Sequence, residues 1–177
     1  MLLLWTGCIP LRFDVEGSRA TMVGDLTGSA PRKVRNLFEE HPDLTTIELV
    51  DCPGSLDDVA ALEASRLVRE QGVDTHVGED GEIASGAVDF FIAGVNRSVT
   101  PGGQVGVHSW SAGSEEGSEL PRDHWEHTLY LDYYADMGID EEFYWFTLDA
   151  ASSDGIHWMT QDELSSYGLT NTEPESR

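Results

Sequence analysis

Basic residues are scarce in this sequence, which has 10 lysines and arginines against 33 aspartates and glutamates and a formal net charge of -23. Lys33 is the only lysine. Nucleic-acid phosphates and anionic membrane surfaces are bound by clustered positive side chains, so the composition argues against both as partners. A strongly acidic chain is also typical of a salt-rich or extracellular setting.

Cysteine is nearly absent, since Cys8 and Cys52 are the only two. Their number and separation match neither a disulfide framework nor the repeated ligand spacing of a zinc site. His124 and His127 are spaced by one helical turn, as two metal ligands would be, but no further cluster of histidine or cysteine follows. We therefore expect no metal and no other cofactor.

Long apolar runs are missing as well. The start of the chain, residues 1–8 (MLLLWTGC), is apolar but far shorter than a membrane span and has no basic region, so we expect no stable membrane span. Its last five residues faintly resemble a bacterial lipobox, with Trp5 in place of a small aliphatic residue. Two alternatives stay open: the remnant of an export signal, which weakly favours a periplasmic or cell-envelope location over the cytoplasm, and ordinary packing of an apolar start.

The length of 177 residues suits one compact domain. We predict an apolar N-terminal segment over 1–10, a single domain over 11–170 and a polar tail over 171–177. The spacing of apolar residues predicts strands over 11–23 (a hairpin), 45–50, 73–77 and 104–108, and a flexible polar insertion over 111–120. It predicts helices over 31–40, 55–71 (with Leu56 and Val59 facing inward), 84–95, 123–137 and 140–150, and a last one after the capping box of Thr160 and Glu163. This alternation predicts a layered α/β fold.

Three short segments carry residues suited to one kind of chemistry. Residues 51–55 (DCPGS) form a predicted strand-to-helix turn, whose backbone N–H groups can face a developing oxyanion. Ser85 has small neighbours at the start of a predicted helix, which leaves room for a substrate carbonyl, and Gly86 adds a second backbone donor. His108 ends a predicted strand, and a histidine can accept the proton of a serine and return it to a leaving group.

These segments resemble the core of the Clp protease proteolytic subunit. The matching residues are Ala84–Ala87 (ASGA), Phe90–Gly94 (FFIAG), Arg97, the stretch from Pro101 to His108, and Tyr167–Leu169 (YGL). The resemblance covers roughly Ala20 to Leu169. It implies a Clp-protease/crotonase-like layered α/β fold of repeated strand-turn-helix units, closest to predicted exported Clp-like proteins of bacteria.

The resemblance also implies roles for single residues. Ser85 corresponds to the family's nucleophile and His108 to its general base. The backbone amides of Gly54, Ser55 and Gly86 correspond to the oxyanion hole.

The sequence departs from the family pattern at two places. Ser55 stands where the family has a second glycine, and its side chain could equally serve as a helix cap. The third member of the catalytic triad, an aspartate, aligns near Ile156, so Asp154 is the nearest carboxylate that could orient His108.

Other residues allow competing interpretations. Cys52 could be a rival nucleophile, although a buried small residue is the better interpretation because no basic residue flanks it. Lys33 could form a serine/lysine dyad, but its basic neighbours favour a solvated helix face. His157 lies beside Asp154 and is either a site residue or a packing residue. The aromatic residues of 130–134 and 143–146 are typical of a core or a subunit interface more than of a substrate groove.

The function that these observations favour is a serine hydrolase of the peptidase or esterase type, acting on a peptide or a small ester or acyl substrate. One alternative is a catalytically weak or inactive Clp-like scaffold for peptide binding or assembly. Another is an acyl-CoA enzyme of the crotonase branch, which the shortage of cations for nucleotide phosphates disfavours. We also expect a homo-oligomer, whose subunit number no sequence feature indicates.

Overall fold

The computed structural model of the chain describes residues 9–113 and 115–173. The predicted export or lipobox segment, with Cys8, and the end of the predicted polar tail lie outside these residues. No helix in the described part of the chain is long and apolar enough to cross a membrane.

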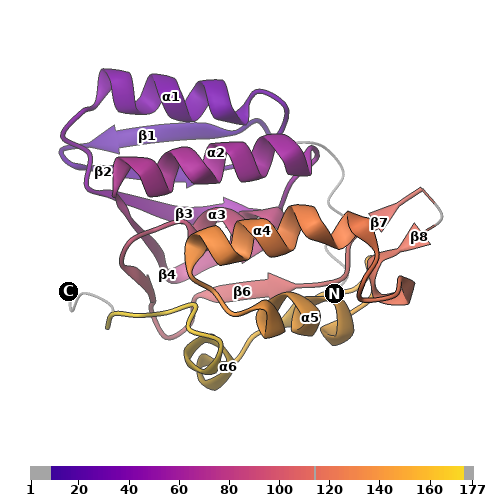
Figure 1. Cartoon of the computed structure of the whole chain (residues 1–177). Helices are drawn as coiled ribbons and strands as arrows, with labels where there is room; N and C mark the ends of the chain where they lie inside the picture. Colours follow the sequence, from indigo (N-terminus) through magenta and orange to yellow (C-terminus); the bar gives the residue numbers. More distant parts are fainter. Residues whose placement is uncertain (1–8, 114, 174–177) are drawn as a thin grey trace.

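A mixed sheet forms the centre of the molecule (Figure 1). Its seven strands in the described residues are β1 (Arg12–Glu16), β2 (Arg19–Val23), β3 (Thr46–Cys52), β4 (Asp74–Ala84), β5 (Arg97–Val99), β6 (Gln104–Val107) and β9 (His157–Trp158). They lie in the order β1-β2-β3-β4-β6-β9, and β5 pairs with the first part of β4. Strands β2 to β6 run parallel, whereas β1 and β9 are antiparallel to their neighbours. The carboxyl ends of the parallel strands therefore gather at one edge, where layered α/β proteins place their ligands.

The helices are α1 (Ala30–Glu40), α2 (Asp58–Gln71), α3 (Gly86–Ile92), α4 (Thr128–Met137), α5 (Glu141–Ala150) and α6 (Gln161–Ser166). Figure 1 shows α2 and α4 in front of the strands and α1 above β1. A small hairpin of β7 (Ser111–Ala112) and β8 (Glu115–Glu116) and two short 3-10 turns, Gly117–Glu119 and Trp125–His127, lead into α4. The layered α/β arrangement confirms the predicted fold class.

Local signals explain several element boundaries. Helix α1 has a proline in its first turn and ends at His41. Helix α2 ends at Gly72, whose φ of 77° lies in the left-handed region that favours glycine. The predicted capping box is present at α6, where the Glu163 N–H donates to the Thr160 hydroxyl and the Glu163 carboxylate accepts from the Thr160 N–H.

The predicted start of the second helix at Ser55 was wrong. Helix α2 begins at Asp58, and its cap is Asp57, whose carboxylate accepts a hydrogen bond from the Ala60 N–H at 3.0 Å. Leu56 and Val59, predicted to face inward, are 66% and 63% exposed. The tertiary pairing of Ser55 with Leu26 holds the preceding turn in an extended conformation, so the helix starts later.

The predicted strand over 73–77 was too short and the helix over 84–95 too long. Strand β4 continues to Ala84 through the exposed residues Glu79 and Asp80, whose polarity hides the strand from sequence patterns. Helix α3 consequently begins at Gly86 and ends at Ile92. Strands β5 and β9 are too short to have shown a period in the sequence.

A buried arginine ties the end of the described chain to the core. Arg97 is 6% exposed and donates hydrogen bonds to the carbonyls of Leu169 (2.8 Å), Gly94 (3.0 Å) and Gly168 (2.9 Å). Buried polar groups stabilise a fold when their hydrogen bonds are satisfied, so Arg97 joins α3 to the segment after α6.

Candidate active site

Ser85 has the most unusual backbone in the described structure. It lies between β4 and α3 with φ 55° and ψ -133°, and no other described non-glycine residue has a positive φ. Its N–H donates to the Gly106 carbonyl at 3.0 Å, and Gly54 packs so closely that a Cβ there would lie 2.9 Å from Ser85 Cβ. Such strain persists only where the surroundings enforce it, and it occurs preferentially at functional sites.

The turn beside Ser85 is held by two backbone hydrogen bonds to Leu26. The Leu26 N–H donates to the Gly54 carbonyl at 2.9 Å, and the Leu56 N–H donates to the Leu26 carbonyl at 2.8 Å. Donors alternate along an extended chain, so the Ser55 N–H points away from Leu26. Gly86 packs against Ser55, since an added Cβ would meet the Ser55 hydroxyl oxygen and lie 2.6 Å from its Cβ and 3.2 Å from its nitrogen. The Gly86 N–H, the first of α3, has no helix carbonyl as partner. The backbones of Ser55 and Gly86 are therefore close neighbours, and their role as oxyanion donors stays a prediction.

The hydroxyl of Ser55 has a different role from its N–H. It donates to the carboxylate of Asp58, in the first turn of α2. The side chain therefore acts within the turn.

His108 follows β6, directly opposite the turn. Its Nδ1 lies 2.7 Å from the Ser109 carbonyl oxygen. A carbonyl only accepts, so Nδ1 carries the proton and Nε2 has the free lone pair that a general base needs. No hydrogen bond joins the Ser85 hydroxyl to this imidazole in the described structure, although both residues line the same two cavities. Such bonds are often long before a substrate binds.

Asp154 makes no hydrogen bond to His108 in the described structure. Its carboxylate is exposed and accepts from the Ser152 hydroxyl at 2.6 Å. Ile156, at the position where the family aspartate aligns, packs instead against β6, where a Cβ on Gly106 would meet its Cγ2 at 2.7 Å. The acceptor at the imidazole is thus the Ser109 carbonyl, and a role for Asp154 stays a prediction.

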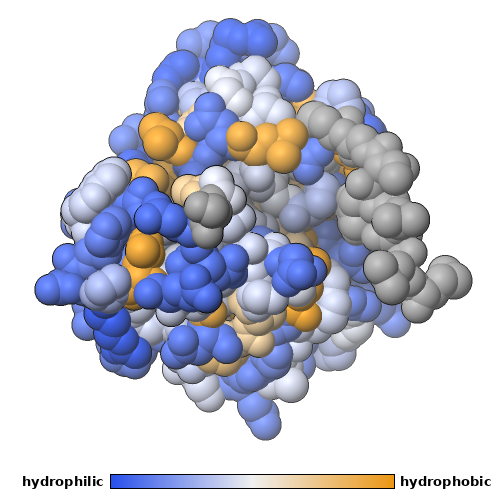
Figure 2. Space-filling model, turned by 90° about the vertical axis from the view of Figure 1, so that its right-hand side faces the viewer, coloured by the Kyte–Doolittle hydropathy of each residue, from blue (hydrophilic) through white to orange (hydrophobic). Residues whose placement is uncertain are grey.

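An outer groove of about 320 Å³ runs past Ser85 on the surface. Its lining includes His108, Leu56, Ile156 and Trp158. Figure 2 views the molecule from the right-hand side of Figure 1, and apolar patches there lie among hydrophilic surface. The exposed apolar side chains of the groove are suited to contact an extended substrate.

A second, smaller cavity of about 50 Å³, which we call the inner cavity, is also lined by Ser85 and His108. It is lined by Asp58 and Asp89, which sequence reasoning missed as site residues. Asp89 is 9% exposed and accepts from the Tyr134 hydroxyl at 2.7 Å. Burial raises the pKa of Asp89 to about 7, with a smaller increase from the nearby Asp58 charge and an opposing effect of the Tyr134 hydrogen bond. The signal that could have identified Asp89 as a site residue is its position four residues after Ser85, one helical turn away.

Cys52 and Lys33, the two alternative candidates for nucleophilic chemistry, are not placed to act as such. The Cys52 thiol is buried and donates to the Met22 carbonyl, and burial raises its pKa to about 12, so little thiolate exists at neutral pH. Lys33 donates to the Leu11 carbonyl from α1 and lines neither cavity next to Ser85.

Three further histidines contact aromatic or acidic side chains. His127 is fully buried, and its Nδ1 lies 2.7 Å from the Tyr144 hydroxyl. His124 lies near Glu126, with 3.5 Å between nitrogen and oxygen, and His157 hydrogen-bonds to Glu163. No group of three or more ligating side chains among the described residues is arranged to hold a metal.

The fold is similar to Clp-protease-like folds, with Ser85 at the junction of a parallel strand and a buried helix. Two solved structures of the 1510-N membrane-bound stomatin-specific protease are similar to it. A serine-to-alanine mutant has a TM-score of 0.59 at 14% identity, over 87% of this chain and 77% of that one. A lysine-to-alanine mutant in complex with a substrate peptide has a TM-score of 0.57 at 13% identity, over 88% and 73%. No protein-family model and no curated protein matches the sequence.

Proposed function

We propose that this protein is a serine hydrolase of peptide or ester bonds, with Ser85 as the nucleophile and His108 as the general base. The observation that carries the proposal is the strained backbone of Ser85, which presents its hydroxyl to two cavities that His108 also lines. The similar protease that was solved with a substrate peptide supports a peptide as substrate.

The proposed reaction follows from the geometry. The Ser85 oxygen attacks the substrate carbonyl carbon while its proton passes to Nε2 of His108, and the carbonyl oxygen becomes negative between the N–H groups of Ser55 and Gly86. The imidazole then protonates the leaving group, and an acyl-enzyme forms. Water attacks this ester in the same way, which releases the acid and restores the serine. The Ser109 carbonyl keeps the imidazole in the required tautomer throughout.

A catalytically weak scaffold is the second candidate function. It is favoured by the missing hydrogen bond between Ser85 and His108 and by the exposed position of Asp154 in the described structure. The acyl-CoA alternative has less support, because the lining of both cavities contains no lysine or arginine to bind a nucleotide phosphate. A homo-oligomer stays a prediction.

Labelling with a fluorophosphonate probe tests the proposal. The folded wild type should be labelled, and Ser85→Ala should abolish the label. Ser166→Ala, which removes an exposed serine from α6, is the matched control and should label like the wild type. His108→Ala should slow labelling by about 10²-fold or more, since a positioned general base contributes that much. A wild type that stays unlabelled over a range of salt concentrations would favour the scaffold.

A further inference from the structure

The inner cavity beside Ser85 contains two acidic side chains that come from different helices. Asp58 belongs to the first turn of α2 and Asp89 to α3. Both residues line the cavity that Ser85 and His108 also line.

These carboxylates have only neutral hydrogen-bond donors. Asp58 accepts from the hydroxyls of Ser55 and, at 2.6 Å, Tyr130. Asp89 accepts from the Tyr134 hydroxyl through Oδ1, while Oδ2 has no hydrogen-bond partner in the described structure. Asp89 is more than nine-tenths buried, and this oxygen, which is not itself fully buried, is open to a further donor.

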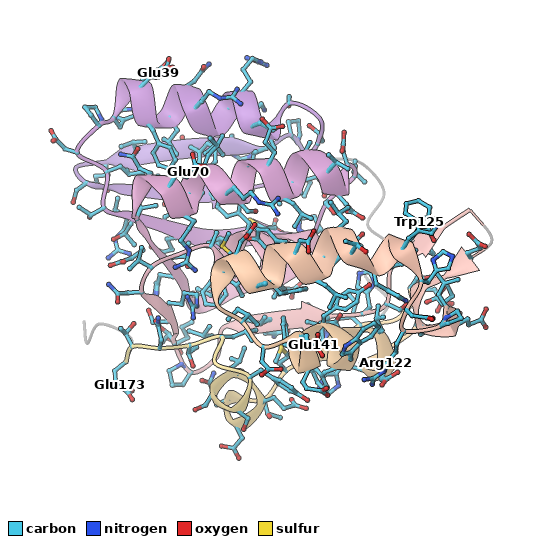
Figure 3. The ribbon with its side chains drawn as sticks, viewed as in Figure 1. Glu39, Glu70, Arg122, Trp125, Glu141 and Glu173 are labelled. Carbon is cyan, nitrogen blue, oxygen red and sulfur yellow. The ribbon has the colours of Figure 1, made fainter. Side chains whose placement is uncertain are left out.

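No cation of the described chain neutralises the pair. Neither aspartate forms a salt bridge with a described lysine or arginine, and no described lysine or arginine lines the cavity. Arg122 and Arg66 contact other side chains instead. The guanidinium of Arg122, labelled in Figure 3, lies 4.7 Å from the centre of the Trp145 ring. Arg66 pairs with Asp136 at 3.0 Å. Burial raises the pKa of Asp89 to about 7, and a cation bound beside it would favour the ionised form that burial disfavours.

Aromatic rings form the rest of the wall. Trp110 and Tyr130 stack at 5.9 Å between ring centres, and Tyr130 and Tyr144 stack at 5.5 Å. All three line the cavity. Aromatic walls combined with carboxylates are a favourable environment for an ammonium or guanidinium group, because the ring faces also attract positive charge.

We propose that the inner cavity binds the positively charged side chain of a substrate residue, lysine or arginine, next to the bond that Ser85 cleaves. The proposal rests on the proposed hydrolase function and names its substrate class. The volume of about 50 Å³ accommodates about four water-sized groups, which corresponds to a cationic head and the adjoining methylenes. The acidic chain as a whole attracts such a substrate.

Binding of a small cation tests the cavity without any catalysis. n-Butylamine is titrated into the full chain while the indole N–H signal of Trp110 is followed by NMR, and n-butanol serves as the neutral probe. The amine should shift this signal in the wild type and in Ser85→Ala, and the alcohol should not. Asp89→Asn and Asp58→Asn should each weaken amine binding by about tenfold or more. Asp43→Asn removes an exposed charge far from the cavity and should change it by less than about twofold.

Paired peptides test selectivity. Two substrates that differ only in lysine against norleucine beside the scissile bond are compared by kcat/KM. The lysine peptide should be preferred by about tenfold or more in the wild type, and Asp89→Asn should remove most of the preference. A second pair of peptides carries arginine or citrulline at the same position. Comparing the two pairs shows whether the cavity prefers the ammonium of lysine or the guanidinium of arginine.

Failure of this inference differs from failure of the hydrolase. A labelled enzyme that shows no preference between lysine and norleucine overturns the cationic pocket and leaves Ser85 as the nucleophile. A wild type without labelling or cleavage overturns the hydrolase, and the amine titration then decides the pocket by itself. Amine binding that is equal in Asp89→Asn, Asp58→Asn and the wild type overturns the pocket in either case.

Discussion

Replacing Asp89 with asparagine should reveal a large dependence of stability on pH. Asparagine has nearly the same shape and keeps an oxygen that can accept the hydroxyl of Tyr134, but it does not titrate. Asp89 is nine-tenths buried in the wild type, so its ionisation carries a strong desolvation penalty. The two proteins should therefore differ most where the wild-type carboxyl is charged.

The size of the effect follows from the pKa of Asp89, which burial raises from its usual value of 3.8 to about 7. Between these values the folded chain holds a proton that the unfolded chain has lost, so stability falls as the pH rises. The contribution is complete below the unfolded pKa and is lost as the pH passes the folded one. One pKa unit corresponds to about 1.4 kcal/mol, so the whole effect is about 4 kcal/mol, of which about 2–3 kcal/mol falls between about pH 5 and about pH 8.

Urea unfolding followed by tryptophan fluorescence measures this difference. Unfolding free energies of the wild type and Asp89→Asn are compared at about pH 5 and about pH 8 at constant ionic strength. The contributions of carboxylates that both proteins share then cancel in the difference. Asp43→Asn is the exposed control, with an expected change under about 0.5 kcal/mol. If the gap between Asp89→Asn and the wild type moved by less than about 0.5 kcal/mol over this range, a strongly raised pKa at Asp89 would be refuted.

Three further substitutions test the rest of the description. Asp154→Asn should leave the fluorophosphonate labelling rate within about twofold, because the Ser109 carbonyl already orients the imidazole; a loss of about tenfold or more would restore the aspartate as triad acid. Gly86→Ala should slow labelling by about tenfold or more, since its methyl would meet the Ser55 hydroxyl oxygen, lie 2.6 Å from Ser55 Cβ and displace the turn that carries the proposed oxyanion donors. Unchanged labelling would remove this turn from the site. Arg97→Lys should lower the unfolding free energy by about 2–4 kcal/mol in urea, because an ammonium cannot reproduce the three carbonyl contacts of the guanidinium, and a loss under about 0.5 kcal/mol would contradict that role.

Element boundaries were predictable where a local signal sets them. The capping box of α6, the glycine that ends α2 and the proline at the start of α1 all act within one helical turn, and the structure confirms them. The second half of β4 was not predictable, because its partners are β3 and β6, and neither leaves a trace in the residues of β4 itself. The late start of α2 has the same cause, since the bridge to Leu26 overrides the local cap pattern.

The residues of the candidate site also differ in how far the sequence predicts them. Ser85 and His108 stand out from short motifs and a resemblance, whereas Asp58 and Asp89 are ordinary helix positions in the sequence. Their significance comes from burial beside the same cavity, and burial depends on helices that are distant in the chain.

The sequence alone determined the alternation of strands and helices, the acidic charge and the pair of residues on which the proposed chemistry rests. These properties depend on residue types and short spacings, which the chain carries before it folds. Only the tertiary structure decided the strained backbone of Ser85, the carbonyl partner of His108 and the cavity that Asp58 and Asp89 share. Each of these requires contact between segments far apart in the chain, because strain, tautomer and desolvation are all set by neighbours in space.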